Sequence, residues 1–302
     1  MTTPAPPAPA QVGLERLQSY NPQEVRAALQ SLLHPLGGMA AFVRPGEHVL
    51  LKPNMLAGKD PARAVTTHPQ IVRSVIELVR ETGGIVSVGD SPGIGTPLSV
   101  ARKCGILEVI EETGAIFAPF ENSVTIRSAG SSFRQLDVAE DIIAADVIIN
   151  LPKLKTHQMM GLSCAVKNMF GAVVGLRKPG LHLHAGTDKM HFALMLLELC
   201  EALAPALTIV DAVIGMEGEG PGNGDPIRIG AVLAGASPQA VDTVATALVG
   251  MRPEQVFTQL QALNSGRPFT RLADLELSGP PLADLCIPHF RPARMTDVNF
   301  GL

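Results

Sequence analysis

The segment from Asn150 to His157 carries the residue types best suited to chemistry in this sequence. Lys153, Lys155 and His157 stand at alternate positions, so an extended chain would present all three on one side. Such a row of donors suits a phosphate or carboxylate group, and crowding of like charges lowers lysine pKa values. A neutral lysine beside another cation could act as a base or a Schiff-base nucleophile. The alternative interpretation is a solvated basic loop.

A second candidate, the pair Lys167-Asn168, follows a run of small residues from Gly161 to Ala165. If this run opens a helix, its free N–H groups would form an anion site with the lysine close by. Tight packing of small residues explains the run equally well. We expect the catalytic residues to be His157, Lys155 and Lys167. The histidine, with an ordinary pKa of ~6.5, would transfer a proton.

Histidines further along the chain could bind a metal ion, because alternate residues of an extended segment can reach one ion. His182 and His184 have this spacing, and His191 follows shortly after. Carboxylates could complete the ligand set. If a divalent metal is bound, we expect its ligands to be His184, His191, Asp211 and Glu217. Chance spacing of packed or exposed histidines is the alternative.

Several common chemistries lack their motifs in this chain. The four cysteines are widely separated and include no Cys-x-x-Cys pair, so we expect neither an iron–sulfur cluster nor a zinc ribbon. Gly93-Ile94-Gly95 fails the dinucleotide fingerprint, and there is no Walker A sequence and no Gly-x-Ser-x-Gly elbow. The cofactor is therefore unknown from the sequence, and a divalent metal is its one candidate.

Composition narrows the range of partners. A net charge of −4 over 302 residues, with no Trp and one Tyr, argues against nucleic-acid binding. No stretch approaches the ~20 apolar residues that cross a bilayer, and the start lacks a signal-peptide pattern. We expect a cytoplasmic protein that binds no membrane. Six Lys/Arg and one acid occur from Leu151 to His191, then six acids and no Lys/Arg from Phe192 to Asp225. This reversal suggests two facing surfaces of opposite charge.

Strands and helices must alternate to position these residues. Periodicity predicts strands at 48–51, 85–88, 146–150 and 207–210, and helices at 22–33, 68–81, 189–203 and 238–249. Asn21 and Thr67 are the expected caps of the first two helices. This alternation predicts an α/β fold, in which a mostly parallel sheet carries helices on both faces of a single large domain.

Polar residues follow all four of these predicted strands, the last of them Asp211. Ligands of open α/β sheets bind beyond the carboxyl ends of the strands. We therefore expect a strand-end cleft that binds a small anionic substrate. Its expected substrate-binding residues are Lys52, Asn54, Asp90, Ser91, Asn150, Lys153 and Asn168.

The chain divides into three expected regions. Residues 1–20 are rich in Pro and Ala and should form a disordered leader. Residues 21–265 should form the α/β domain, and residues 266–302 a Pro-rich, irregular tail that packs on it. Within the domain, the acidic loop 215–224 contains five glycines, which indicates either a mobile lid or backbone packed close to a site.

Six motifs occur in a fixed order: KPN at 52–54, TTHP at 66–69, GDSPG at 89–93, NLPKLKTH at 150–157, KNMFG at 167–171 and EGEGPG at 217–222. In this combination the chain resembles the uncharacterised domain-of-unknown-function family numbered 362, over roughly Gly46 to Gly250. The resemblance implies that these segments act as a unit in an α/β fold. Members are often labelled iron–sulfur cluster-binding proteins because many carry a ferredoxin-like module, which is missing from this chain.

We expect an enzyme that acts on a small phosphorylated or carboxylated substrate. The reaction could be metal-assisted, or a redox reaction with electrons from a separate ferredoxin, and a homodimer stays open. Two alternatives compete with the enzyme. One is a non-catalytic binding or scaffold protein whose basic segment docks an acidic partner, and the other is a metal-delivery protein.

Overall fold

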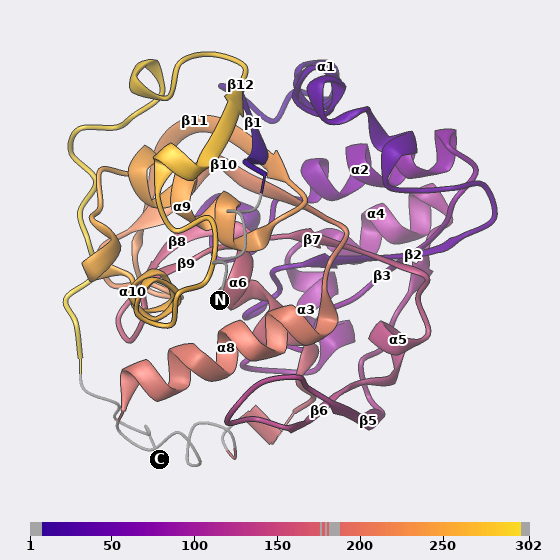
Figure 1. The fold of residues 1–302 in the computed structure, drawn as a ribbon. Helices are drawn as coiled ribbons and strands as arrows, with labels where there is room; N and C mark the ends of the chain where they lie inside the picture. The colour runs from indigo at the N-terminus through magenta and orange to yellow at the C-terminus, as the bar shows by residue number, and fades with distance from the viewer. Residues whose placement is uncertain (1–7, 176, 179, 181–187, 297–302) are drawn as a thin grey trace.

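The computed structural model describes residues 8–175, 177–178, 180 and 188–296 (Figure 1). Its strands are β1 (Ala10–Arg16), β2 (His48–Pro53), β3 (Ile85–Val88), β4 (Ile116–Phe117), β5 (Ser123–Arg127), β6 (Gln135–Ala139), β7 (Val147–Leu151), β8 (Lys153–His157), β9 (Gly161–Ser163), β10 (Leu207–Glu217), β11 (Asp225–Gly235) and β12 (Leu275–Ser278). Its α-helices are α1 (Pro22–Leu33), α2 (Pro69–Glu81), α3 (Pro97–Lys103), α4 (Ile106–Thr113), α5 (Glu140–Ile143), α6 (Ala165–Asn168), α8 (Lys189–Leu203), α9 (Pro238–Leu248) and α10 (Phe257–Asn264).

A mixed sheet of 10 strands runs through the described part of the chain. Eight of its strands follow the order β12-β1-β11-β10-β7-β2-β3-β4, while β8 pairs with β10 and β9 pairs with β8. The neighbours from β10 to β4 are parallel, whereas β11 runs antiparallel to both β1 and β10. The predicted α/β fold, one domain with a mostly parallel sheet, is thereby confirmed.

Helices cover both faces of this sheet (Figure 1). Val49 and Leu51 of β2 pack into the core that contains α1, α2 and α4, whereas Leu50 packs into the core that contains α6 and α8. Side chains alternate along a strand. Lys52 therefore follows Leu50 onto the α6 and α8 side of the sheet, where the candidate site lies.

The two ends of the described chain differ from expectation. Residues 10–16, predicted to belong to a disordered leader, form β1, which lies between β11 and β12. Val12 and Leu14 fill one face of this strand and are 0% and 1% exposed. The strand forms because β11, more than two hundred residues away, provides its backbone partners, as Val12 opposite Gly235 shows. Part of the predicted irregular tail is likewise regular, as β12.

Two expected strand boundaries at the site were wrong. β10 continues through Asp211 to Glu217, so Asp211 is a buried mid-strand residue. Residues 153–157 form β8 instead of a strand-end loop. Both segments pair with each other, Asp211 opposite Lys153, and this long-range pairing extends them beyond what local sequence predicts.

The cap of α2 also differs from expectation, whereas the predicted cap of α1, Asn21, is confirmed. The ring of His68 caps α2 by accepting a hydrogen bond from the backbone of Gln70 at 3.1 Å. The Thr67 hydroxyl is used elsewhere, because it accepts from the Asn54 backbone and donates to the Leu151 carbonyl, at 2.9 and 2.6 Å. Thr67 thus fastens the end of β2 to the end of β7.

Candidate functional site

Five lysines gather where β2, β7 and β8 meet α6 and the loop after β3: Lys52, Lys153, Lys155, Lys167 and Lys178. We call these five residues the lysine cluster. Its three strand residues, from β2 and β8, are 0–1% exposed, so they belong to the interior of the protein. Burial of an ammonium group is costly unless a carboxylate or several hydrogen-bond acceptors accompany it. The partners of each lysine therefore decide what the cluster can do.

Lys52 forms a buried ion pair with Asp90, with 2.8 Å between Nζ and Oδ1. Its ammonium group also donates to the Asn168 carbonyl, and the second oxygen of Asp90 accepts from the Met55 backbone at 2.8 Å. Burial lowers the pKa of Lys52, and the charge of Asp90 partly opposes that change. This pair joins β2 to the loop after β3.

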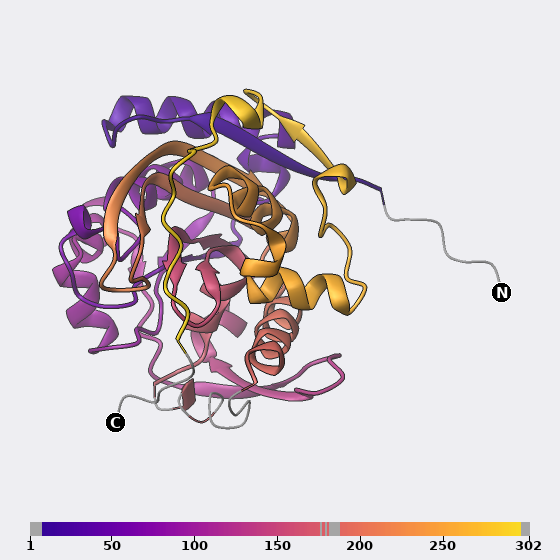
Figure 2. The same cartoon turned by 90° about the vertical axis from the view of Figure 1, so that its left-hand side faces the viewer.

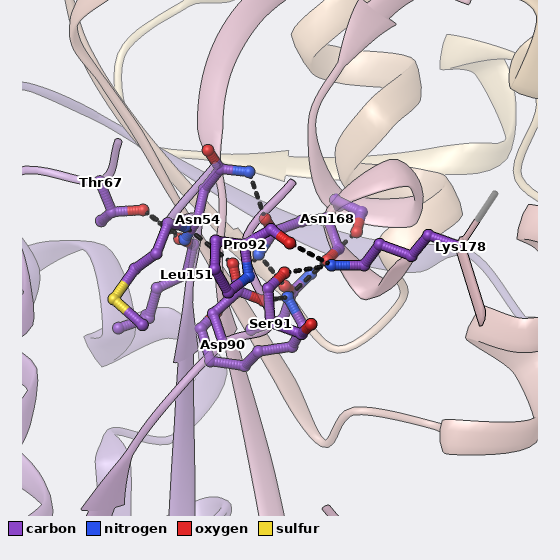
Figure 3. A network of polar contacts seen from close by, with 12 residues as sticks. Asn54, Thr67, Asp90, Ser91, Pro92, Leu151, Asn168 and Lys178 are labelled. Carbon is purple, nitrogen blue, oxygen red and sulfur yellow. Dashed lines mark hydrogen bonds and ion pairs between the residues drawn. The ribbon is translucent and has the colours of Figure 1, made fainter. Parts of the chain in front are cut away.

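Three asparagines form a hydrogen-bonded chain behind this pair, and Figure 3 labels two of them, Asn54 and Asn168. The Asn168 amide donates to Oδ1 of Asn150 at 2.8 Å and to the Lys52 carbonyl at 3.2 Å. Its oxygen accepts from the Asn54 amide at 2.9 Å. Asn150 in turn donates to the Ala165 carbonyl at 3.0 Å. The chain ties α6 to the ends of β2 and β7, so these three expected substrate-binding residues hold the framework of the site.

Lys155 lies against the same framework without a carboxylate partner. Its ammonium group donates to Oδ1 of Asn54 at 2.8 Å and to the Val65 carbonyl at 2.6 Å. Burial is the main cause that lowers the pKa of Lys155 to about 7, and the charges of Lys167 and Lys153 act in the same direction. A large share of this buried amine is therefore neutral near pH 7.

Lys167 and Lys178 are the partly exposed members of the lysine cluster. Lys178 reaches the carbonyls of Ser91 and Pro92, the latter at 3.0 Å (Figure 3). Burial and Lys52 lower the pKa of Lys178 to about 8, although Asp90 opposes them. Burial, followed by the charges of Lys178 and Lys52, lowers the pKa of Lys167 to about 7. The two side chains thus repel each other across one shared region.

The aromatic rings of Phe170 and Phe192 surround the end of Lys167. Its Nζ lies 4.9 Å from the centre of the first ring and 5.7 Å from the second. Ring faces attract a cation, so these contacts favour the charged form of Lys167, against the effect of its burial, without offering it a hydrogen-bond acceptor.

Lys153 has a complete set of partners. It donates to Oδ2 of Asp211 at 2.6 Å, to the Tyr20 hydroxyl at 3.0 Å and to the Ile214 carbonyl at 2.9 Å. An ammonium group has three N–H donors, and all three are used. Tyr20 stacks on the His68 ring at 3.5 Å between ring centres, and the His68 backbone donates to Asp211 at 2.9 Å. Lys153 therefore has a structural role in the described protein.

Sequence reasoning missed Tyr20 and His68 as parts of this network. Tyr20 precedes the Asn21 cap, and His68 occurs in the TTHP motif, so a local role for each was visible. The stacking of the two rings joins residues that are far apart in the sequence. The same holds for the hydrogen bond that the Tyr20 hydroxyl donates to Oδ1 of Asp211 at 2.8 Å. The uniqueness of Tyr20 in the chain was the available signal.

His157 ends β8 at the edge of the site. Its Nδ1 accepts from the backbones of Met159 and Met160, at 3.1 and 3.3 Å, which orients the ring. The acidic loop 215–224 lies beside His157, because the neighbouring Thr156 hydroxyl donates to the Gly218 carbonyl at 2.9 Å. A Cβ atom on Gly220 would overlap Thr156. Close backbone packing thus explains this glycine.

The C-terminal segment crosses the same region, past the β10–β11 hairpin (Figure 2). Arg291 lies beside Glu217, whose carboxylate accepts from the Arg291 backbone at 2.9 Å. The Arg291 carbonyl accepts from the Gly218 backbone at 2.8 Å. Glu217, an expected metal ligand, is therefore engaged in fastening this segment to the hairpin.

The two other expected metal ligands that the structure describes, His191 and Asp211, have different neighbours. His182 and His184 lie outside the described residues. His191, at the start of α8, packs its ring against Phe133 at 4.9 Å between centres. Asp211 is bound to Lys153. Within the residues that the structure describes, no three His, Cys, Asp or Glu side chains are placed to hold one metal ion.

The run from Gly161 to Ala165 does not open a helix, so the condition for an anion site at a helix start is not met. It forms β9, and α6 begins only at Ala165. The first backbone N–H groups of α6, from Ala165 and Val166, donate to the buried carboxylate of Asp242 at 2.6 and 3.0 Å. A carboxylate of α9 already occupies the position where an anion was expected, so the lysines themselves are what the site offers a ligand.

A pocket of about 230 Å³ occurs elsewhere, between the β5–β6 turn and α8. Glu198 on its wall is 1% exposed and accepts hydrogen bonds from the backbones of Ser131, Ser132 and Phe133, at 2.8, 3.3 and 2.8 Å. These bonds show that the Glu198 carboxylate holds the β5–β6 turn in place.

None of the helices in the described ranges is long and apolar enough to cross a membrane.

Comparison with solved structures finds distant likenesses. The lactate racemase apoprotein from Thermoanaerobacterium thermosaccharolyticum is 11% identical, with a TM-score of 0.47, over 76% of this chain and 55% of that one. A protein from Thermotoga maritima is 13% identical, with a TM-score of 0.40, over 82% of this chain and 60% of that one. At these scores neither structure informs the chemistry.

Comparison with known sequences is more specific. A thylakoid-associated protein of Synechocystis sp. is 37% identical over 293 residues, which cover 96% of this chain and 90% of that protein. The model of the domain of unknown function DUF362 matches residues 49–247. This range contains β3, β7, β8, α6 and all of β2 except His48, and therefore all five residues of the lysine cluster and the three asparagines of its framework. The chain belongs to the DUF362 family.

Proposed function

We propose that this protein is an enzyme that binds a small anionic substrate, phosphorylated or carboxylated, at the lysine cluster. One observation carries the proposal. Among the described residues, the five lysines form two buried ion pairs, with Asp90 and Asp211, and the other three have no carboxylate partner. The surplus of positive charge lies at the strand ends, where open α/β sheets bind their ligands.

An anion would relieve the electrostatic cost of this surplus. Lys167 repels Lys155 and is repelled by Lys178, and the pKa values of Lys155, Lys167 and Lys178 are lowered to about 7, 7 and 8. A phosphate or carboxylate beside them would favour their charged forms and raise these pKa values. Binding should therefore take up protons from solution near pH 7.5. Amines that titrate near pH 7 also suit proton transfer, with His157 as a further candidate for that step.

Burial distinguishes this function from docking of an acidic protein. Lys52, Lys153 and Lys155 are 0–1% exposed, and a macromolecular partner cannot reach side chains inside the sheet layers. Lys167 and Lys178 are partly exposed and would meet a small ligand first. Metal-assisted and ferredoxin-linked versions of the reaction share this anion site, so the anion is the part to test first.

The test is thermal unfolding of the full chain with inorganic phosphate, pyrophosphate, citrate and malonate, followed by calorimetry of any stabilising anion in two buffers of different ionisation enthalpy. We expect a rise in melting temperature and net proton uptake. Lys178→Gln should weaken binding on the order of tenfold, since a charge-assisted hydrogen bond is worth about 1.5–3 kcal/mol. The exposed Lys103→Gln is the matched control. Equal binding by both variants, or stabilisation by none of the four anions, would contradict the proposal.

We place this activity in the cytoplasm. The name of the Synechocystis relative makes attachment to a membrane surface the competing location. Fractionation of cells that express the tagged chain would separate the two. Recovery with membranes that persists in low salt and is lost in high salt would favour peripheral attachment, and recovery in the soluble fraction would favour the cytoplasm.

A further inference from the structure

Lys167 differs from the rest of the lysine cluster in what its amine contacts. The other four members donate to protein oxygens. Around Lys167 lie the rings of Phe170 and Phe192, at 4.9 and 5.7 Å, and the described part of the chain offers its Nζ no oxygen acceptor. Its lone pair and its protons are therefore available to a ligand.

Accessibility separates Lys167 from Lys155, the other amine that is largely neutral near pH 7. Lys155 is 1% exposed and donates two hydrogen bonds that hold it to β2 and to the Val65 carbonyl. Lys167 is partly exposed. A nucleophilic lysine needs a neutral amine, a route for the substrate and freedom from competing acceptors. Lys167 combines a pKa lowered to about 7 with partial exposure and with no oxygen acceptor among the described residues, whereas Lys155 shares only the lowered pKa.

We propose that Lys167 is a nucleophile that forms an imine with a small carbonyl compound, whose anionic group pairs with Lys178. This inference rests on the proposed function, because it assigns the substrate class of the same anion site. The substrate would be a carbonyl compound that also carries a carboxylate or a phosphate, such as a 2-oxo acid or a phosphorylated aldehyde.

The chemistry balances without a further reactant. The neutral Nζ of Lys167 adds to the carbonyl carbon, and a proton passes from the nitrogen to the former carbonyl oxygen to give a carbinolamine. A proton from solution then lets this hydroxyl leave as water, which leaves a protonated imine, and hydrolysis reverses both steps. The positive charge of the protonated imine then lies where the Phe170 and Phe192 rings already hold an ammonium group, so the cation–π contact favours the intermediate.

The position of Lys178 fits the anionic end of such a compound. Its charge is the first neighbouring charge that lowers the pKa of Lys167, so the two amines lie within electrostatic range of each other. Lys178 uses two donors on the Ser91 and Pro92 carbonyls, which leaves one of its three for a ligand. One end of a small substrate would thus be held by Lys178 while its carbonyl group is attacked by Lys167.

Reductive trapping tests this inference on the full chain. The protein is incubated with pyruvate or with glycolaldehyde phosphate in the presence of cyanoborohydride, and peptides are mapped by mass spectrometry. We expect the reduced adduct on the peptide that contains Lys167, with trapping that increases as pH rises through 7. Propanoate and glycerol 3-phosphate, which lack the carbonyl, should stabilise the protein without an adduct. Stronger trapping and stabilisation by pyruvate and propanoate would identify the anionic group as a carboxylate, and stronger effects of glycolaldehyde phosphate and glycerol 3-phosphate would identify it as a phosphate.

Two variants and a control make the result specific. Lys167→Arg keeps the charge but cannot form an imine, so the adduct should disappear while stabilisation by propanoate or glycerol 3-phosphate persists. Lys178→Gln should raise the half-saturating probe concentration on the order of tenfold. Lys189→Arg is the control, because Lys189 also lies over a phenylalanine ring, that of Phe257 at 5.6 Å, and should leave trapping unchanged.

The outcomes separate this inference from the function on which it rests. Stabilisation by propanoate or glycerol 3-phosphate without an adduct on Lys167 would overturn the imine and leave the anion site standing. Equal labelling of Lys167 and Lys189 in the wild-type protein would also overturn it, whether or not a variant folds. Failure of every carboxylate and phosphate probe to stabilise the protein would overturn both.

Discussion

The backbone of Gly171 lies directly against the carboxylate of Asp90. A Cβ atom on Gly171 would overlap Oδ1 of Asp90 and lie 2.6 Å from Nζ of Lys52. The Gly171 carbonyl also accepts a hydrogen bond from the Ser91 backbone at 3.0 Å. The turn after α6 therefore covers the buried ion pair and excludes water from it. Glycine is required here by the space available.

Gly171→Ala should consequently separate Lys52 from Asp90. Because opening a buried ion pair leaves two desolvated charges, we expect the free energy of unfolding to fall by about 3 kcal/mol. Urea denaturation measures this change. Gly222→Ala is the control, since its Cβ would meet its neighbour, Leu56, at an ordinary 3.7 Å. Equal losses in the two variants would contradict the packing role of Gly171.

The Lys153–Asp211 pair should behave as a strongly coupled unit. Lys153→Met or Asp211→Asn alone should lower the free energy of unfolding by about 3–5 kcal/mol. The first leaves the buried Asp211 carboxylate, and the second the buried Lys153 ammonium group, without the opposite charge. The double variant should cost less than the sum, by about 1–3 kcal/mol. The same double-mutant cycle on the exposed pair Arg26–Glu81 should show a much smaller coupling. Comparable coupling in both pairs would argue against the buried network.

Asn168 should be the most sensitive of the three asparagines. Asn168→Leu removes the amide that serves Asn150, Asn54 and the Lys52 carbonyl, so two buried polar groups and the partly buried Asn54 amide lose this hydrogen bond. We expect a loss of about 3 kcal/mol or more in urea denaturation. Asn264→Leu, at the exposed end of α10, should change stability little. A tolerant Asn168 would show that water can replace the amide.

Stability should depend on pH through His68. Burial lowers the pKa of His68 from 6.5 to about 4, although Asp211 opposes this effect. Between these values the unfolded chain binds a proton that the folded protein does not, so stability is lost as pH falls from 6.5 towards 4. The full contribution is about 3 kcal/mol. His68→Asn keeps an acceptor for the helix cap and should flatten this dependence. A proton NMR titration of His68 with a midpoint near 6 would contradict it.

Asp242 should act in the opposite direction. Burial raises the pKa of this carboxyl from 3.8 to about 6, against the two backbone N–H groups that favour the charged form. The folded protein therefore holds a proton between these values that the unfolded chain has released, and this contribution to stability declines as pH rises towards 6. Asp242→Asn should remove it. The free energy of unfolding in urea is measured against pH for each variant and subtracted from that of the wild type, which separates the contributions of His68 and Asp242. A pH dependence that Asp242→Asn leaves unchanged would refute the role of Asp242.

Local elements followed from the sequence with few errors. The strand Ile85–Val88 and the helix Lys189–Leu203 have their predicted bounds, because hydrophobic periodicity and flanking polar residues act over a few positions. β1 and the second half of β10 were not predicted as strands. Their pairing partners lie far away in the chain or across a turn. The hydrophobic pattern of a short segment does not reveal a strand partner that is distant in the sequence.

By itself, the sequence determined the α/β class, the family motifs and the positions of the lysines and asparagines at strand ends. Only the tertiary structure decided what each of these residues does. Lys153 and Lys155 are two positions apart in one strand, yet the first is neutralised by Asp211 and the second is not. The burial of each lysine, its ion pairing and the pKa of Lys167 depend on neighbours that the fold brings together from β2, α6 and α8. Electrostatic energy is set by distance in space and by desolvation, and neither can be read from spacing along the chain.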